Sequence, residues 1–401
     1  MQRRHLLQLG LGATLPTRLW AASPAASEHQ PRLLVVFLRG AYDAANLLVP
    51  TSSSFYYEAR PNIAIAKTAA LPLDSDWGLA PAVADSIQPL WGRGQAAFVP
   101  FAGSHDLSRS HFETQDHIEL GQPEQGSRDF RSGFMNRLAT VLGSSSRLEA
   151  MAFTDQVPLI LRGDRPVANQ ALRDLNKPGI NAAQAEVIAG MYAGTRFAGA
   201  VRGGFEVRDE VGREMAGMKA QEMAAEMEAA SRGAIAPKGF ALEARRVARL
   251  MRERVTLGFI DVGGWDTHVG QGGATGQLAN KLGELGRGLA LFADEMGPQW
   301  DNTVVVVVSE FGRTFRENGN RGTDHGHGSA YWVLGGGVRG GRIAGEQQQI
   351  KAATLHQNRD YPVLNEYRDV LGGLLARMYG LNAAQLAQVF PGASARDVGL
   401  I

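Results

Sequence analysis

The most informative stretch of the chain is a run of five valines, Val304 to Val308, followed at once by polar residues. An uninterrupted apolar run of this length is typical of a strand buried on both faces of a sheet. Ligands of open α/β sheets bind beyond the carboxyl ends of such strands. Carboxylate and imidazole groups at that position suit a divalent metal ion. The residues of this kind that follow the valine strand are Glu310, Asp324, His325 and His327.

Other predicted strands also end in groups that could bind a metal ion. Asp266 and His268 come shortly after an apolar run at 255–260, and Asp43 comes after another at 33–38. Each has an alternative role, because a loop hydrogen bond, an Asx turn or a helix cap also uses such residues. Histidines and carboxylates gathered at several strand ends are what a two-metal hydrolytic centre requires. The predicted metal ligands are Asp43, Asp266, His268, Glu310, Asp324, His325 and His327.

A candidate nucleophile lies where a predicted helix begins, after the apolar run at 96–101. Ser108, Arg109 and Ser110 stand together there. A hydroxyl at the amino terminus of a helix, beside an arginine, lies in a positive field that favours an attack on an oxyanion ester. The alternative is plain capping of the helix, with Glu113 completing a capping box behind Ser110. We expect Ser110 or Ser108 to be the nucleophile, and the sequence does not decide between them.

Two arginines are candidates for gripping the non-bridging oxygens of such an ester. Arg109 stands beside the serines, and Arg313 lies three residues after Glu310. The planar guanidinium group matches the geometry of a phosphate or sulfate group. Arg313 has an alternative role as the ion-pair partner of Glu310.

The predicted elements that position these residues alternate between strands and helices. Leucines at helical spacing predict a helix over 278–296, between the strand at 255–260 and the valine strand. Strand, helix and strand in this order imply parallel pairing, so we expect an α/β fold, a mostly parallel sheet with helices on both faces. A last strand is expected over 330–337. Pro100 lacks a ladder donor and is expected to fray its strand.

One region differs in character from the rest. Few strand-like runs occur between about 144 and 235, and the segment 206–232 is rich in Ala, Glu, Met and Lys. These residues are strong helix formers. We therefore expect a helical cap insertion over about 144–235 in a single α/β domain spanning 32–395.

Composition excludes several functional classes. The 401 residues include 41 Lys and Arg against 40 Asp and Glu, which gives no electrostatic reason to expect nucleic acid or an anionic membrane as partner. The absence of cysteine excludes disulfides and thiolate metal sites. Glycine, at 49 residues, clusters beside the polar motifs, as expected where a backbone turns sharply.

The amino terminus reads as a twin-arginine export signal over residues 1–26. Arg3 and Arg4 precede a short apolar stretch and the small residues Ala21 to Ala26. The stretch is too short and too weakly apolar for a membrane span. We expect a periplasmic or otherwise exported protein that uses the twin-arginine translocase, with cleavage after Ala22 or Ala25. A disordered tail is the alternative. Because this route exports folded proteins that often carry a cofactor, it also favours a bound metal.

The chain resembles the exported bacterial family catalogued as domain of unknown function 1501. The resemblance spans nearly the whole chain beyond the export signal. It rests on the segments 36–46 (VFLRGAYDAAN), 108–121 (SRSHFETQDHIELG), 263–268 (GGWDTH), 309–314 (SEFGRT), 324–341 and 366–373. The activity of that family is not established, so the resemblance by itself implies no reaction.

The family in turn is similar to the alkaline phosphatase and sulfatase superfamily, which implies a three-layer α/β sandwich with a two-metal site. By this similarity Asp43 binds one metal ion, and Ser108 or Ser110 is the nucleophile. Asp261 or Asp266 together with His268 would follow a later strand. His325 or His327 would supply the last histidine. These assignments are implied by the resemblance alone.

One position departs from the superfamily pattern. Where the superfamily has an Asp-His pair after the penultimate strand, this chain has Glu310 and Phe311. Glutamate can replace aspartate as an oxygen ligand, but phenylalanine cannot replace histidine. Either Asp324 and His325 fold in to restore the pair, or the second metal site is weakened or lost.

The sequence thus predicts a metal-dependent hydrolase of phosphate or sulfate esters in the cell envelope. The expected metal is zinc, with manganese or calcium as alternatives. The expected substrate is a small ester or an envelope polymer that carries one. The alternative function is a non-catalytic exported scaffold or binding protein that retains the fold and one metal ion.

Overall fold

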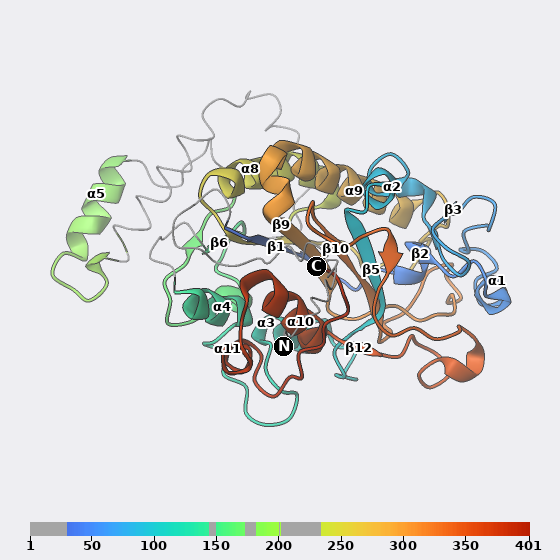
Figure 1. Cartoon of the computed structure of the whole chain (residues 1–401). Helices are drawn as coiled ribbons and strands as arrows, with labels where there is room; N and C mark the ends of the chain where they lie inside the picture. The colour runs from blue at the N-terminus through green and yellow to red at the C-terminus, as the bar shows by residue number, and fades with distance from the viewer. Residues whose placement is uncertain (1–29, 144–149, 173–181, 200, 202–233) are drawn as a thin grey trace, which may run out of the picture.

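The computed structural model describes residues 30–143, 150–172, 182–199, 201 and 234–401. Among these residues, nine strands form one sheet in the order β11-β5-β10-β9-β1-β8-β6-β7, with β12 pairing beside β5 (Figure 1). The strands of this sheet are β1 (Arg32–Leu38), β5 (Ala96–Gly103), β6 (Ala150–Ala152), β7 (Ala168–Asn169), β8 (Leu257–Val262), β9 (Thr303–Ser309), β10 (Ser329–Leu334), β11 (Arg342–Ile343) and β12 (Asn365–Glu366).

A second, small sheet lies outside the main one. It consists of β2 (Leu48–Val49), β4 (Gly78–Leu79) and β3 (Leu71–Pro72). The helices are α1 (Ser54–Ala59), α2 (Ile87–Gly92), α3 (His111–Leu120), α4 (Phe134–Leu142), α5 (Ala182–Met191), α8 (Pro237–Glu253), α9 (Gln277–Met296), α10 (Tyr367–Tyr379) and α11 (Ala383–Val389). The 3-10 turns are η2 (Ala44–Asn46), η3 (Pro81–Val83), η4 (Leu159–Leu161), η5 (Gly297–Asn302) and η6 (Ala352–Thr354).

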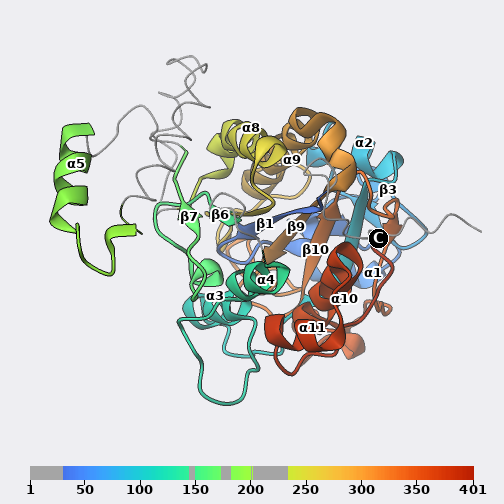
Figure 2. The ribbon, with the colours of Figure 1, turned by 60° about the vertical axis from the view of Figure 1, so that its left-hand side comes forward.

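The alternation of side chains along β1 divides the interior into two cores. Leu34 and Val36 pack in one core with residues of α8 and α9. Leu33 and Val35 point to the other face and pack in the second core with residues of α4 and α10. Figure 2 shows α8 and α9 on one side of the sheet and α3, α4, α10 and α11 on the other. The predicted three-layer α/β fold is therefore confirmed.

The valine strand β9 lies near the middle of the sheet. It pairs in parallel with β1, and β1 pairs in parallel with β8. All seven residues of β9 are buried, as expected for a strand covered on both faces. The carboxyl ends of three adjacent strands consequently meet at one edge of the sheet. Strand β10 runs antiparallel to both β9 and β5, so the sheet is mostly but not wholly parallel.

Strand β5 continues through Pro100 instead of fraying there. The register with β10 shifts between Ser329 and Ala330, so that Phe101 is the extra residue of a bulge. Phe101 has a positive φ of 53°, which fits that irregularity. A bulge is one of the places where a sheet accepts proline.

The region expected to be an insertion contributes in part to the main sheet. Strands β6 and β7 pair in parallel with each other, and β6 pairs in parallel with β8. Strand β6 has three residues and β7 has two, and strands this short give no recognisable pattern in the sequence. The sequence therefore predicted few strands in this region. The methionine-containing segment 206–232, where a helix was expected, lies outside the described residues, as does the predicted export signal over 1–26. None of the described helices is long and apolar enough to cross a membrane.

Candidate metal centre

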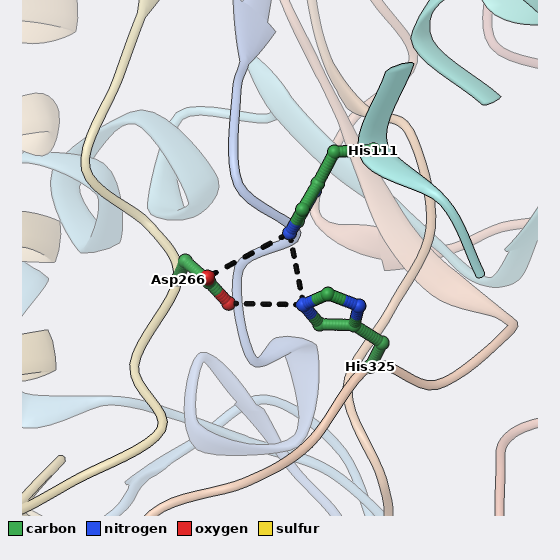
Figure 3. Close-up of side chains that lie close together, drawn as sticks. All are labelled: His111, Asp266 and His325. Carbon is green, nitrogen blue, oxygen red and sulfur yellow. Dashed lines mark hydrogen bonds and ion pairs between the residues drawn. The ribbon is translucent and has the colours of Figure 1, made fainter. Parts of the chain in front are cut away.

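Side chains from three separate segments converge beyond the carboxyl ends of β1, β8 and β9. Asp266 comes from the loop after β8, His111 is the first residue of α3, and His325 comes from the loop between β9 and β10. Figure 3 shows the three side chains pointing toward one another. One ligand atom from each lies within 4.8 Å of the others, a spacing that could hold a metal ion.

A third imidazole joins this cluster. The Nε2 atom of His325 lies 2.9 Å from Nε2 of His111 and 3.2 Å from Nε2 of His268. Asp266 places its Oδ1 atom 2.9 Å from Nε2 of His268 and 3.4 Å from Nε2 of His325. Its Oδ2 atom is 3.7 Å from Nε2 of His111. Asp266 and His325 thus each approach the rings of both His111 and His268.

The other nitrogen of each ring contacts an acceptor. Nδ1 of His111 lies 2.8 Å from a carboxylate oxygen of Glu310, and Nδ1 of His268 lies 3.2 Å from one of Asp324. Nδ1 of His325 lies 3.0 Å from the backbone carbonyl of Arg109. Carboxylates and carbonyls only accept, so each Nδ1 has a partner to which it can donate a proton. In the tautomer with the proton on Nδ1, the lone pair of the ring lies on Nε2 and points into the cluster. With no cation bound, the Asp266 carboxylate is the acceptor for a proton on Nε2, and its Oδ1 atom lies 2.9 Å from Nε2 of His268.

Three inward lone pairs repel one another unless a cation or a proton lies between them. Burial lowers the basicity of His111, but its contacts with Asp266 and Glu310 outweigh burial and raise its pKa to about 9. Without a metal ion, a proton on this ring therefore bridges the cluster at neutral pH. Three imidazoles and one carboxylate fit zinc, which prefers nitrogen and sulfur ligands at about four positions. They do not fit calcium, which takes six to eight oxygen ligands.

Asp266 is held from behind by Arg313. The guanidinium group of Arg313 donates to Oδ1 of Asp266 and to the backbone carbonyl of Thr323, and the Arg313 side chain is fully buried. Burial raises the pKa of Asp266, but hydrogen bonds from His111, His325 and Arg313 outweigh this and hold the pKa well below its ordinary value. Arg313 therefore positions an acidic residue of the cluster and keeps it ionised. The sequence predicted that Arg313 grips the oxygens of an ester. In the structure its guanidinium group donates to Asp266 and Thr323 instead.

Glu310 is a support for the cluster and not one of its converging groups. Its side chain is completely buried, and its Oε1 atom contacts Nδ1 of His111, Nε2 of Gln115 and the backbone N–H of Gly40 at 2.8–2.9 Å. Burial raises its pKa, but the hydrogen bonds with His111 and Gln115 outweigh burial and bring the pKa below its ordinary value, so Glu310 is ionised. Carboxylates that accept from the outer nitrogen of a histidine ligand raise its basicity and fix its tautomer. Glu310 has this place relative to His111.

The close approach of the loops depends on glycine at position 40. Gly40 has a φ of +115°, and a Cβ atom there would lie 2.9 Å from the backbone nitrogen of Asp266. Both its conformation and its surroundings therefore require glycine. This lets the backbone after β1 reach Glu310 and the loop of Asp266 together.

The loop between β9 and β10 folds back on itself and brings His325 beside Phe311. Backbone bonds join Gly312 to His327 at 2.7 Å and Gly326 to Gly312 at 2.9 Å, and Arg313 and His325 form an antiparallel bridge. The ring of Phe311 stacks on the ring of His111 with centroids 5.0 Å apart. Phe311 thus packs against a histidine of the cluster instead of supplying one, and His325 is the residue that moves in.

The structure does not bring Asp43 into this cluster. Its carboxylate forms a fully buried ion pair with Arg60 at 2.5 Å, and it accepts further hydrogen bonds from Gln271 at 2.6 Å and from the backbone of Ala45 at 3.2 Å. Its bond to Ala45 also caps η2, the alternative role expected for an aspartate at this position. Both oxygens of Asp43 therefore have partners within the protein.

Two further predicted ligands lie at the margin of the cluster. Asp324 accepts from His268 and from Asn318 at 3.0 Å, so it orients His268 without joining the converging atoms. His327 is buried, and its ring packs against that of His356 with centroids 5.1 Å apart. Burial, together with nearby His356, lowers the pKa of His327 to about 4. His327 is therefore neutral and lies outside the cluster.

The predicted catalytic serines stand at the entrance to α3. Ser110 is the residue before α3, directly ahead of His111, and its hydroxyl forms no capping bond, so the expected capping box is not made. Ser108 contacts Thr114 at 3.3 Å and accepts from the backbone of Ser110. The side chain of Arg109 is bonded to Asp360 at 2.8 Å.

Sequence reasoning missed His111 as a member of the cluster. The signal that could have identified it is its place, since it lies directly after a strand and loop like those that carry Asp266 and His325. Arg39 and Gln115 were also missed. Arg39 bonds Asp261 at 2.5 Å and Gln115 at 2.8 Å, and Gln115 in turn bonds Glu310.

Two solved structures have a limited similarity to this chain. A protein of the alkaline phosphatase superfamily from Vibrio parahaemolyticus is similar, with 10% identity and a TM-score of 0.38, over 87% of this chain and 66% of that chain. Ps i-CgsB, in a crystal structure with k-i-k-neocarrahexaose, is similar with 10% identity and a TM-score of 0.40, over 91% of this chain and 75% of that chain. At this level of similarity neither structure assigns an activity.

A search of curated proteins found no match. A family model does match, and it covers residues 30–390. The chain therefore belongs to the family described as "Protein of unknown function (DUF1501)".

Proposed function

We propose that the protein is a metal-dependent hydrolase of phosphate or sulfate esters that binds one divalent cation, zinc, between His111, His268, His325 and Asp266. The observation that carries the proposal is the convergence of three Nε2 atoms while each Nδ1 contacts an acceptor. Such an arrangement orients imidazoles as metal ligands before the metal binds.

The site is open enough to receive a substrate. The side chains of Asp266 and His268 are 42% and 39% exposed, whereas Glu310 behind them is buried. Three neutral imidazoles and one carboxylate leave a bound divalent cation with a net positive charge, which attracts an anionic ester. The cation would supply Lewis-acid polarisation of an ester oxygen.

We assign the attack to Ser110. Its hydroxyl is not used for capping, and it lies one residue before His111 at the amino terminus of a ten-residue helix. That position places a developing negative charge in the favourable field of the helix dipole. Ser108 is less suited, because its hydroxyl already contacts Thr114. Replacing Ser110 with alanine should reduce hydrolysis by about two orders of magnitude or more, while Ser108→Ala should have a smaller effect.

The first test is metal content together with hydrolysis. Purified protein loaded with zinc should hold about one zinc per chain by elemental analysis, and His325→Ala should hold much less while keeping the same circular dichroism spectrum. Aryl phosphates and aryl sulfates are the substrates to assay, with His356→Ala as a control histidine outside the cluster. If neither zinc nor manganese binds the wild-type protein, the proposal fails.

Export completes the proposal. Residues 1–26 would direct the folded protein through the twin-arginine translocase, and the substrate would be a small ester or an envelope polymer carrying one. Replacing Arg3 and Arg4 with lysines and locating the protein by cell fractionation would test this step.

The alternative function is a non-catalytic exported scaffold that holds one metal ion. Its support is that Arg109 and Arg313, the expected grips for the ester, both have carboxylate partners. Zinc binding without turnover of any phosphate or sulfate ester would favour this alternative.

A further inference from the structure

Two arginines contact a histidine of the metal centre without supplying one of its converging groups. Arg359 donates from its guanidinium group to the backbone carbonyl of His325 at 2.8 Å. Arg109 accepts from the ring of His325 through its own backbone carbonyl at 3.0 Å. Both residues therefore flank His325, one of the histidines of the cluster. Their side chains meet at a third residue, Asp360.

The charges of this group do not balance. Arg109 and Arg359 share a single oxygen of Asp360, at 2.8 and 3.0 Å. The Asp360 side chain is completely buried, and among the described residues its other oxygen, Oδ1, has no hydrogen-bond partner. Two guanidinium groups against one carboxylate leave a net positive charge. The arginine side chains remain 26% and 37% exposed, so that charge reaches solvent.

Backbone strain is concentrated at the same place. In the described part of the chain, six residues other than glycine have a positive φ, and Arg109, Gln357 and Asn358 are three of them, at 52–54°. Gln357 accepts from the guanidinium group of Arg109 at 3.0 Å, so the strained residues contact one another. Strain of this kind persists where the surrounding structure fixes a conformation, and it clusters at ligand-binding sites. A loop that only neutralised Asp360 would not need it.

We propose that Arg109 and Arg359 form a subsite for a second anionic group of the substrate, next to the metal centre. This inference rests on the proposed function and narrows it, because the substrate then carries at least two phosphate, sulfate or carboxylate groups. Paired guanidinium groups bind tetrahedral oxyanions and carboxylates through forked hydrogen bonds. Arg109 would thus grip a remote anionic group of the substrate, while the ester that reacts lies at the metal.

Binding of non-hydrolysable probes tests the subsite without relying on turnover. Zinc-loaded protein is titrated by calorimetry with methylphosphonate and with α,ω-alkane bisphosphonates of one to six methylene groups, at a fixed ionic strength. At least one bisphosphonate should bind 10-fold or more tightly than methylphosphonate. Arg359→Gln should reduce this preference to within threefold. Because Arg359 also donates to the backbone carbonyl of His325, both affinities of the variant are measured on protein whose zinc content has been determined, and the preference is the ratio of the two. Matched alkane bissulfonates and biscarboxylates distinguish the kinds of anion.

Controls separate the subsite from the proposed activity. Arg377, on α10, forms an exposed surface pair with Asp397. Arg377→Gln therefore removes one positive charge away from the subsite and should keep the preference for the bisphosphonate. Arg109→Gln should act like Arg359→Gln, and thermal unfolding verifies that both variants are folded. Equal affinities for methylphosphonate and every bisphosphonate in the zinc-loaded wild type would overturn the subsite, whether or not the protein hydrolyses esters. A preference that survives in both arginine variants would overturn it as well.

Anion binding at Arg109 and Arg359 can also be measured without a bound metal ion. If zinc does not bind, the same titrations in the metal-free protein should still show inorganic phosphate binding that both Arg109→Gln and Arg359→Gln weaken. If the protein binds phosphate in this way but does not bind zinc, the proposed function is refuted and the anion subsite stands. If it binds neither zinc nor phosphate, both proposals are refuted.

Discussion

Replacing Glu310 with glutamine isolates the contribution of the buried carboxylate to the metal centre. The substitution preserves shape, and the remaining carbonyl oxygen can still accept from His111, Gln115 and Gly40, which are all bonded to the Oε1 atom. The negative charge is lost, and an amide NH2 group replaces the Oε2 atom, which accepts from the hydroxyl of Ser309 at 2.9 Å and does not contact His111. Substitution of an outer partner of a metal-ligating histidine commonly weakens metal binding by about 10–100-fold, or about 1.4–2.7 kcal/mol.

The pH of the measurement decides how much of this loss is seen. The pKa of His111 is raised to about 9, so at pH 7 zinc must displace a proton, which reduces its apparent affinity in the wild type by about 100-fold. Glu310→Gln lowers this pKa and so relieves part of the proton competition. The deficit of the variant should therefore be close to its full 10–100-fold at pH 9 and smaller at pH 7.

The assay is competition for zinc against a chromophoric chelator at both pH values. Glu119→Gln is the matched control, because Glu119 is also buried but bonds Arg39 and the backbone of Ile160 at 2.8–2.9 Å without contacting His111. The control should lose stability yet keep its zinc affinity within about threefold, since no ligand depends on it directly. Equal zinc affinities of the wild type and Glu310→Gln at pH 9 would refute the reasoning, as would a deficit that grows toward pH 7.

Three further predictions concern residues around the centre. Asp43→Asn leaves the guanidinium group of Arg60 buried without its countercharge, so the free energy of unfolding in urea should fall by about 3–5 kcal/mol with zinc content unchanged. The pKa of His327 is lowered to about 4, so between about pH 6.5 and pH 4 the unfolded chain takes up a proton that the folded protein does not, and stability is lost as pH falls through that window. The loss is at most about 3 kcal/mol, and His327→Gln should remove it when metal-free unfolding is compared at pH 7 and pH 4.5. Arg313→Lys loses the fork that holds Asp266 and should weaken zinc binding by about 10-fold in the chelator assay, and an unchanged affinity would contradict that role.

The sheet could be predicted from the sequence because its signals are local. The buried runs that became β1, β8 and β9 each end in polar residues, and both features lie within about ten residues of chain. The parallel order followed from the helix between β8 and β9. The antiparallel direction of β10 left no such local trace.

Which polar residues meet at that edge could not be predicted, because it depends on the path of the loops. Asp43 and Asp266 have the same kind of sequence environment, yet Asp43 is paired with Arg60, seventeen residues away. His325 reaches the cluster only because the loop after β9 folds back on Gly312. His111 is one histidine at a helix start, and nothing in its neighbours distinguishes it from a capping residue until the fold places it opposite Asp266.

The surroundings of Asp43 and of Phe311 both bear on how many cations this edge of the sheet can bind. A carboxylate buried at the end of β1 needs a cation, and here the guanidinium group of Arg60 supplies it permanently and without exchange with solvent. Phe311 lies at the corresponding end of β9 and packs its ring on His111, so no second imidazole is directed toward Asp43 from that strand. The positive charge that a second metal ion would bring is thus already present as a side chain. The three imidazoles of the cluster lie around Asp266, where neighbouring Nε2 atoms are 2.9 and 3.2 Å apart. This division of charge supports the proposed centre with a single exchangeable cation.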